Sequence, residues 1–262
     1  MKLVILAGGL GTRISEESQF KPKPMLEIGE MPILWHIMKI YSSYGVNEFI
    51  ICAGYKQHVI KEWFADYFLH TSDITFDYTG GTNQMIVHNK HVEPWKVTIV
   101  DTGLYTQTGG RVKRIREYVD NETFMFTYGD AIGDINISEL LKYHRSHGRI
   151  GTMSMCNFGQ SKGVVEVGEN GLVDAFREKS DLDGDLINIG FMVFEPQIFD
   201  YLEDADDNTA FENEPLNNLI ADKQLMGYIH RGYWQCMDTK REKDKIEALW
   251  ESGHAPWKTW ED

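Results

Sequence analysis

The chain has 262 residues, of which 42% are hydrophobic and 25% are charged, a balance typical of globular proteins. Its 26 basic and 40 acidic side chains give a formal net charge of −14. Such a chain lacks the positive faces that bind nucleic acids or anionic membranes, so neither partner is expected. No apolar run approaches the roughly 18 residues of a membrane span or a secretory signal. With three scattered cysteines, we expect a protein of the reducing cytoplasm.

The first half of the chain alternates short apolar runs with amphipathic segments. The apolar runs end at glycine or Gly-Asp, which predicts buried strands, and the other segments carry apolar residues at helical spacing. The predicted elements are strands over 3–7, 48–52 and 123–128, and helices over 32–44, 59–68 and 137–146. This order is typical of a parallel sheet with crossover helices.

After Gly151 the pattern changes to short alternating segments at 163–167, 173–177 and 189–194, separated by turn residues. A final amphipathic helix is predicted over 241–250, followed by an aromatic tail. We find no repeat and no linker in the sequence. We therefore expect one α/β domain over residues 1–262, with a Rossmann-like, mixed but mainly parallel sheet flanked by helices and a smaller mixed β portion.

The segment LAGGLGTR, residues 6–13, follows the first predicted strand. Its closely spaced glycines let backbone amides approach a phosphate, and Arg13 adds a charge-assisted donor. The later KPKP segment holds Lys21 and Lys23 on extended backbone, which we expect to lie near the loop. The spacing matches neither a P-loop nor the GxGxxG pattern. A purely structural glycine turn is the alternative, but the three basic residues favour a phosphate site.

Several strings in order resemble one known family. They are LAGGLGTRISEES, KPKPMLEIGEMPILWHIMKIYSSYG, GYKQHVIKEWF, VDTGLYTQTGGRVKRIREY, FTYGDAIGDIN, FREK, INIGF, GYWQCMDTKRE and APWKTW. The chain resembles the sugar-phosphate nucleotidyltransferases, and among them the glucose-1-phosphate cytidylyltransferase branch. The resemblance covers nearly the whole chain.

This resemblance implies an Mg²⁺-dependent enzyme of the EC 2.7.7 class. It would transfer CMP from CTP to a phosphorylated small molecule, by default glucose 1-phosphate, giving CDP-glucose and pyrophosphate. Residues 1–150 would mainly bind the nucleotide, and residues 151–262 would mainly bind the acceptor. The implied catalytic residues are Arg13 and Lys23. The implied nucleotide-binding residues are Leu6, Ala7, Gly8, Gly9, Gly11, Thr12, Arg13, Lys23, Thr108, Gly109, Gly110 and Arg111.

Asp130 and Asp238 match the metal-holding aspartates of this family. Asp130 ends a predicted strand, and the carboxyl end of a strand is where open α/β sheets bind ligands. A turn or capping role is the alternative for Asp130, and an N-cap before the last helix is the alternative for Asp238. For Arg111 the alternative is a solvent-exposed helix face, an interpretation that suits Arg114 and Arg116 better.

The implied acceptor residues are Lys162, Glu178, Lys179 and Asn188. Here the sequence departs from the family pattern, because Ile189 replaces a small glycine and would crowd the sugar pocket. An acceptor other than glucose 1-phosphate stays open for that reason. Enzymes that transfer CMP to phosphorylated glutamine in capsule phosphoramidate biosynthesis offer one such acceptor, whose carboxylate could pair with Lys162.

Two further expectations concern activity and assembly. A non-catalytic CTP sensor is the alternative of another class, although simple binding would not need Arg13, Lys23, Asp130 and Asp238 together. Members of the family often form homo-oligomers, and we expect one here. The tryptophans Trp250, Trp257 and Trp260 would anchor the tail on the body or on a neighbouring subunit.

Overall fold

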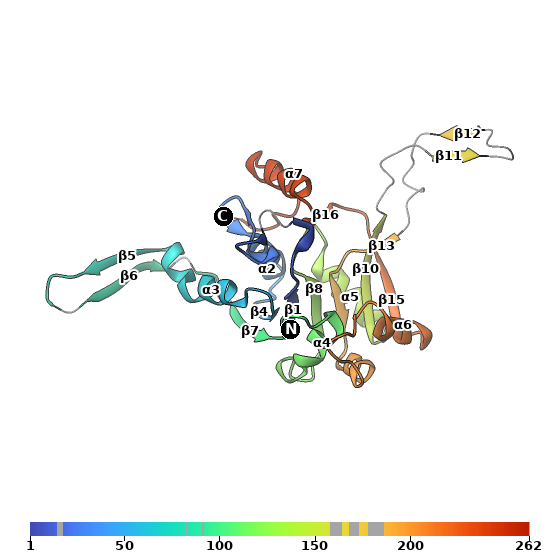
Figure 1. Ribbon diagram of the computed structural model, residues 1–262, viewed down its shortest axis with the longest axis horizontal. Helices are drawn as coiled ribbons and strands as arrows, with labels where there is room; N and C mark the ends of the chain where they lie inside the picture. The colour runs from blue at the N-terminus through green and yellow to red at the C-terminus, as the bar shows by residue number, and fades with distance from the viewer. Residues whose placement is uncertain are drawn as a thin grey trace.

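The computed structural model describes residues 1–14, 18–81, 83–90, 92–157, 164–167, 173–177 and 186–261. A mixed sheet forms its centre (Figure 1). Its strands are β1 (Lys2–Ala7), β4 (Glu48–Ala53), β7 (Lys96–Asp101), β8 (Phe124–Tyr128), β10 (Gly151–Asn157), β13 (Leu186–Asn188), β14 (Met192–Phe194) and β15 (Leu225–His230). The neighbours β8, β1, β4 and β7 run parallel in that order. Beyond β8 the sheet continues with β14 and then β10, both antiparallel pairings.

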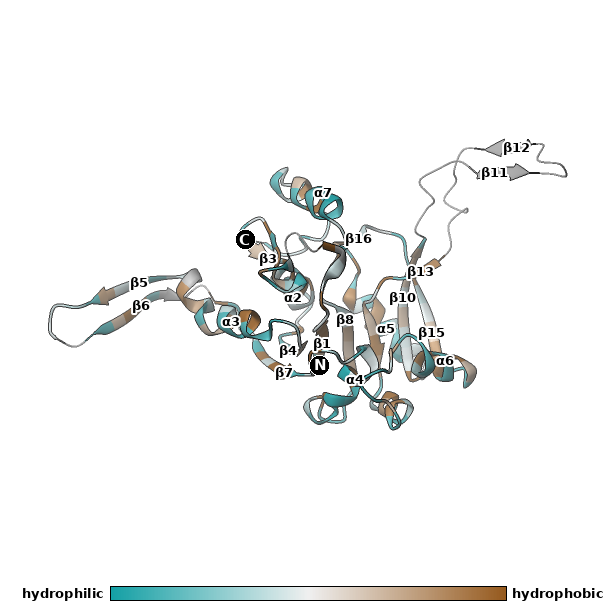
Figure 2. Ribbon diagram, in the orientation of Figure 1, coloured by the Kyte–Doolittle hydropathy of each residue, from teal (hydrophilic) through white to brown (hydrophobic). Residues whose placement is uncertain are grey.

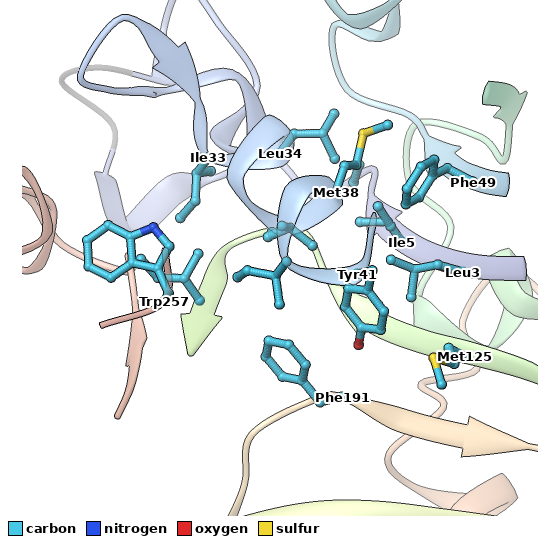
Figure 3. Packing of buried hydrophobic residues seen from close by; sticks show 14 of the residues in the cluster. Leu3, Ile5, Ile33, Leu34, Met38, Tyr41, Phe49, Met125, Phe191 and Trp257 are labelled. Carbon is cyan, nitrogen blue, oxygen red and sulfur yellow. The ribbon is translucent and has the colours of Figure 1, made fainter. Parts of the chain in front are cut away.

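Helices cover both faces of this sheet. They are α2 (Ile33–Ser42), α3 (Gln57–Thr71), α4 (Thr108–Arg114), α5 (Ile137–His147), α6 (Glu214–Ala221) and α7 (Lys240–Glu251). Side chains alternate along a strand, so β1 contributes Leu3 and Ile5 to one hydrophobic cluster and Val4 and Leu6 to the other. Figure 3 shows the first cluster, where the ring of Tyr41 on α2 stacks on Phe191.

Short two-stranded pairs complete the fold. They are β2 (Glu27–Ile28) with β3 (Met31–Pro32), β5 (Ser72–Asp77) with β6 (Gln84–Lys90), β9 (Ala131–Gly133) with β16 (Trp234–Cys236), and β11 (Val164–Val167) with β12 (Val173–Arg177). The β5–β6 hairpin extends away from the body (Figure 1). Its Phe76 and Tyr78 are exposed, and the hairpin carries hydrophobic as well as hydrophilic segments (Figure 2). No helix in the described ranges is long and apolar enough to cross a membrane.

The six elements predicted in the first half are confirmed, with ends shifted by a few residues. The β5–β6 hairpin and β7 are not among the predicted elements. In the second half, the predicted strand over 189–194 is too long, because the positive φ angles of Gly190 and Phe191 are not those of a strand and β14 begins only after them. The expected segments 163–167 and 173–177 form the separate β11–β12 pair, whereas 189–194 gives β14 of the main sheet. The strands β13 and β15, which the sequence did not predict, also extend the main sheet by pairing with β10.

The aromatic tail is anchored on α2. Trp257 is fully buried, and its indole nitrogen donates to Nδ1 of the buried His36 at 3.4 Å. The other ring nitrogen of His36, Nε2, lies 2.9 Å from the carbonyl oxygen of Ile28. These contacts fix a neutral imidazole that donates from Nε2 and accepts at Nδ1. The predicted anchoring of Trp257 on the body is confirmed, and His36 is part of that packing.

A buried arginine joins α4 to the carboxyl ends of three parallel strands. Arg111 is 4% exposed. Its guanidinium donates to the carbonyl oxygens of Gly8 after β1, Ala53 at the end of β4, and Gly103 after β7, at 3.0, 3.3 and 2.7 Å. It also donates to the hydroxyl of Thr102 at 2.8 Å. One side chain therefore holds the ends of these strands together.

The glycines around this guanidinium make the arrangement possible. A Cβ added to Gly8 would lie 2.1 Å from an Arg111 nitrogen, and one added to Gly54 would lie 2.5 Å from the same nitrogen. No side chain can occupy either position without displacing the arginine. The glycines that follow β1 and β4 are therefore required by the close approach of Arg111.

The burial of His36 predicts a loss of stability in acid. Burial lowers the pKa of His36 from 6.5 to about 4, although its hydrogen bond to Ile28 opposes the shift. Between these pH values the unfolded chain binds a proton that the folded chain excludes, so stability falls as pH falls from 6.5 to 4. The loss from this residue is about 3 kcal/mol at the lower end. Urea unfolding at several pH values measures it.

His36→Gln removes the titrating ring, so its free energy of unfolding should depend less on pH than that of the wild type. His254→Gln is the matched control, because His254 is exposed. Equal pH dependence in the wild type and His36→Gln would contradict the assignment.

A lysine cannot replace Arg111, because its single nitrogen cannot reach acceptors on three strand ends. We expect Arg111→Lys to lower the free energy of unfolding by about 3 kcal/mol, as buried carbonyls lose charged donors. Urea unfolding measures this loss. Arg145→Lys, at an exposed position on α5, should change stability little. Similar losses in the two variants would show that Arg111 does not hold the strand ends.

Candidate active site

A cavity of about 350 Å³ opens at the carboxyl ends of β1 and β8. Open α/β sheets bind ligands at this edge. It is lined by Leu6, Ala7, Gly8, Gly9, Leu10, Gly11, Thr12, Ile14, Lys23, Pro24, Thr106, Gln107, Thr108, Arg111, Tyr128, Gly129, Asp130 and Asp238. The predicted nucleotide-binding residues Leu6, Ala7, Gly8, Gly9, Gly11 and Thr12 of the first loop are therefore in its wall.

The glycine-rich loop is held from several sides. The carbonyl oxygen of Gly8 accepts from the amide of Tyr55 at 3.2 Å as well as from Arg111. The carbonyl oxygen of Gly11 accepts from the hydroxyl of Ser18 at 2.9 Å. Because carbonyls of the loop are bonded to the protein, its shape is set before a ligand arrives. Arg13 lies in the short helix Thr12–Ile14, and its side chain is outside the description.

Two aspartates far apart in the sequence meet through a small β pairing. The strand β9 pairs with β16, with Ala131 opposite Cys236. The next backbone bond runs from the amide of Met237 to the carbonyl oxygen of Asp130, at 2.8 Å. This register places Asp130 and Asp238 at the same edge of the cavity. Long-range pairing thus creates a two-carboxylate cluster that neither local sequence contains.

The ammonium group of Lys23 bridges these two carboxylates. Its Nζ lies 2.6 Å from Asp130 and 2.5 Å from Asp238. The lysine side chain is 12% exposed, so solvent screens these ion pairs only in part. Burial alone would lower the pKa of Lys23, but the attraction of Asp130 and Asp238 outweighs burial and raises it. Lys23 is therefore held in its charged form.

The capping alternatives for Asp130 and Asp238 are wrong, whereas the turn expected at Asp130 is present. The N-cap of α7 is Thr239, which forms a capping box with Glu242. Asp130 lies in the turn between β8 and β9 and caps no helix. Carboxylate oxygens are the ligands that Mg²⁺ prefers, and a magnesium site often uses only one or two of them beside substrate phosphates. Asp130 and Asp238 fit that donor set.

The residues of the second glycine-rich segment, 108–111, have two different roles. Thr108 and Arg111 line the cavity, as predicted, but Gly109 and Gly110 do not. Both glycines are buried in α4, and the amide of Gly109 donates to the carbonyl oxygen of Thr209 at 2.9 Å. They lack side chains because the 206–211 segment packs directly against them.

Other basic residues expected near the loop lie elsewhere. Lys21 is half exposed and pairs with Glu27 outside the cavity. Lys113 donates to the carbonyl oxygens of Glu203 and Ala205. Of the two KPKP lysines, only Lys23 reaches the cavity, because the chain turns into the short helix Lys23–Met25 after Pro22.

Of the predicted acceptor residues, Lys162, Glu178 and Lys179 lie outside the described residues. Asn188 ends β13, and its Oδ1 accepts from the amide of Gly190 at 2.9 Å. The expectation that Ile189 crowds a sugar pocket is wrong. Ile189 is 1% exposed and belongs to the first hydrophobic cluster. Its side chain points into the core because strand β13 ends just before it.

Sequence reasoning missed Tyr128 and Glu212. Tyr128 ends β8 in the cavity wall, and its hydroxyl donates to Glu212 at 2.7 Å. Burial, with the nearby negative charge of Glu212, raises the pKa of Tyr128 well above its usual range. Tyr128 lies at the end of a strand, two residues before Asp130, and this position could have indicated a site residue. Nothing local marks Glu212, because its contacts are all long-range.

Comparison with known proteins identifies the family. The model of the family described as "Nucleotidyl transferase" matches residues 2–252. The chain is 53% identical to the glucose-1-phosphate cytidylyltransferase of Salmonella typhi over 262 residues, the whole of both chains. It is 44% identical to a protein of Bacillus subtilis (strain 168) described as a probable glucose-1-phosphate cytidylyltransferase, over 99% of this chain and all of that one.

The fold is also that of a solved sugar nucleotidyltransferase. A crystal structure of UDP-glucose pyrophosphorylase complexed with UDP-glucose matches 96% of this chain and 98% of that chain, with a TM-score of 0.68 and 16% identity. At that identity the likeness concerns the fold alone. The family match over residues 2–252 and the identity of 53% over the whole chain show that this chain belongs to the nucleotidyl transferase family.

Proposed function

We propose that this enzyme is a glucose-1-phosphate cytidylyltransferase, which transfers CMP from CTP to glucose 1-phosphate and releases pyrophosphate. The observation that carries the proposal is the meeting of Lys23, Asp130 and Asp238 in a glycine-walled cavity. This arrangement occurs in a chain 53% identical, from end to end, to an enzyme of that name.

The reaction joins two anions, so it depends on alignment and charge neutralisation. A phosphate oxygen of the sugar attacks the α-phosphorus of CTP, and the bond to pyrophosphate breaks. We assign the amides of Gly8, Gly9 and Gly11 to the nucleotide and Arg13 to the triphosphate. Lys23 would neutralise charge where the two phosphates meet, because its ammonium group is charged and already faces the cavity.

Asp130 and Asp238 would hold Mg²⁺, which when bound would offset negative charge on the triphosphate. Arg111 contributes differently from the predicted direct contact. Its donors are bonded to carbonyl oxygens of strand ends, so we assign it to shaping the glycine-rich loop from beneath. Its buried positive charge also lies at the cavity wall, on the side where an anionic ligand would bind.

Glucose 1-phosphate is the proposed acceptor rather than phosphorylated glutamine. One argument for an altered acceptor was the bulk of Ile189, and that side chain is buried in the core. The two relatives compared above at 53% and 44% identity both carry the glucose-1-phosphate name. Assembly into a homo-oligomer, like the division of the chain into nucleotide and acceptor halves, remains part of the proposal.

A substrate matrix tests the function. Pyrophosphate release is measured with Mg²⁺ for each nucleoside triphosphate against glucose 1-phosphate and phosphoglutamine. We expect turnover with CTP and glucose 1-phosphate and at least tenfold lower turnover for the other pairs. Turnover with UTP or dTTP but not CTP would contradict the assigned base, and turnover with phosphoglutamine alone would contradict the acceptor. Saturable CTP binding without pyrophosphate release from any pair would instead indicate a sensor.

The bridging lysine predicts how metal binds. The described ranges contain no cluster of three or more His, Cys, Asp or Glu side chains that could hold a metal, and the carboxylates in the described cavity wall are those of Asp130 and Asp238. Lys23 competes for both of them. We therefore expect weak Mn²⁺ binding by the ligand-free protein, measured by electron paramagnetic resonance. Added CTP should strengthen it, because triphosphate oxygens supply ligands and attract Lys23.

Lys23→Ala should bind Mn²⁺ at least tenfold more tightly than the wild type in the absence of CTP. Lys21→Ala is the matched control, since Lys21 pairs with Glu27 outside the cavity, and its Mn²⁺ affinity should equal that of the wild type. Unchanged affinity in Lys23→Ala would show that the ammonium group does not compete with the metal.

A further inference from the structure

The segment between β13 and β14, residues 189–191, lies against the end of β8. Gly190 has a φ of 73°, a left-handed conformation that glycine adopts without strain. A Cβ at this position would lie 3.1 Å from both Thr127 and Tyr128, so the segment around Gly190 packs closely on β8. The amide of Gly190 donates to Oδ1 of Asn188 at 2.9 Å. One end of the Asn188 amide is thus committed to the backbone.

The other end of this amide contacts Tyr128. Nδ2 of Asn188 donates to the hydroxyl oxygen of Tyr128 at 3.3 Å. The same hydroxyl donates its only hydrogen to Oε1 of Glu212 at 2.7 Å. Since that hydrogen is used, the tyrosine oxygen can only accept from Asn188. The two contacts together permit one orientation of the Asn188 amide, with oxygen toward Gly190 and nitrogen toward Tyr128.

Glu212 is held from a second side. Its Oε2 accepts from the hydroxyl of Thr108 at 2.5 Å, and that hydroxyl accepts from the amide of Phe211 at 2.8 Å. Thr108 begins α4 and Tyr128 ends β8, so the carboxylate joins two walls of the cavity without itself lining it. Glu212 is on the surface, yet both of its oxygens have partners inside the protein.

We propose that Glu212 is a positioning residue for the acceptor: through the Tyr128 hydroxyl it fixes the Asn188 amide, so that the remaining Nδ2 hydrogen is presented to a sugar hydroxyl oxygen. This inference rests on the proposed function and on the acceptor contact that the family resemblance implies for Asn188. Neither Glu212 nor Tyr128 belongs to the residues that the family resemblance implies.

Removing the carboxylate would free the hydrogen of Tyr128. The hydroxyl could then donate to Oδ1 of Asn188 and compete with Gly190, and the amide would populate two orientations. Only one of them presents a donor to the acceptor. Acceptor binding would weaken, while Lys23 and the glycine-rich loop, which Glu212 does not contact, would bind CTP as before.

Steady-state kinetics test the proposal, with pyrophosphate release as the readout. Glu212→Ala should raise KM for glucose 1-phosphate by about fivefold to tenfold, the cost of one misdirected hydrogen bond, with kcat and the KM for CTP within twofold of the wild type. Tyr128→Phe should have a similar effect, and the double variant should add little. Glu212→Gln, which can still accept from Tyr128, should restore most of the affinity.

A matched control and a second readout separate positioning from a structural tie. Glu214→Ala changes a nearby exposed carboxylate and should leave kcat and both KM values unchanged. Thermal unfolding shows whether each variant folds. An unchanged acceptor KM in Glu212→Ala, an equal rise in Glu214→Ala, or an equal rise of the CTP and acceptor KM values in Glu212→Ala would overturn the proposal.

A readout independent of activity distinguishes failure of the proposal from failure of the assigned reaction. With selective ¹⁵N labelling of asparagine, the side-chain amide signals of Asn188 are identified by their loss in Asn188→Asp. They should shift in Glu212→Ala and Tyr128→Phe and stay in place in Glu214→Ala. If the wild type does not turn over glucose 1-phosphate yet these signals respond, the reaction assignment fails and the positioning stands. Signals that do not respond overturn the positioning itself.

Discussion

The guanidinium of Arg111 contacts the glycine-rich loop, residues 6–13, which forms one wall of the cavity. It is buried, and its direct carbonyl partners are at the ends of β1, β4 and β7, while the carboxylates of Asp101 and Asp207 act on its charge from farther away. Carbonyl oxygens at the carboxyl ends of parallel strands are otherwise short of donors, so cation and strand ends satisfy each other. The glycines at Gly8 and Gly54 follow from this packing. Arg111 therefore shapes the glycine-rich loop together with Tyr55 and Ser18, which also donate to its carbonyl oxygens.

The charge around the cavity differs from that of the molecule as a whole. The chain carries −14, yet the charged side chains in the described cavity wall are Lys23, Arg111, Asp130 and Asp238, two positive and two negative. Lys23 pairs directly with the two aspartates, whereas the groups in direct contact with Arg111 are carbonyl and hydroxyl oxygens. An anion entering the cavity would therefore not meet the negative charge that the chain carries overall. Net charge argues against polyanionic partners, but it carries no information about a small phosphate ligand.

Much of the fold was predictable because its signals are local. Strand β1, helix α2 and strand β4 were found from apolar runs and helical spacing, and the glycine-rich loop from its composition. The positions that sequence reasoning misjudged depend on long-range packing. Ile189 was expected beside a sugar, but a break in the strand turns it into the core. Gly109 looked like part of a phosphate loop, yet it lacks a side chain because the 206–211 segment packs on it.

The same distinction between local and long-range signals applies to the paired aspartates and to Glu212. Asp130 and Asp238 could be paired only because the family pattern relates them, since the β9–β16 register that joins them leaves no trace in either local sequence. Glu212 has no motif at all, and it gains its role from hydrogen bonds to Thr108 and Tyr128, 104 and 84 residues away. The cavity is complete only after the sheet, α4 and the segment before α6 have come together. Folding and assembly of the site are thus one event, and the residues that join its walls contribute to both.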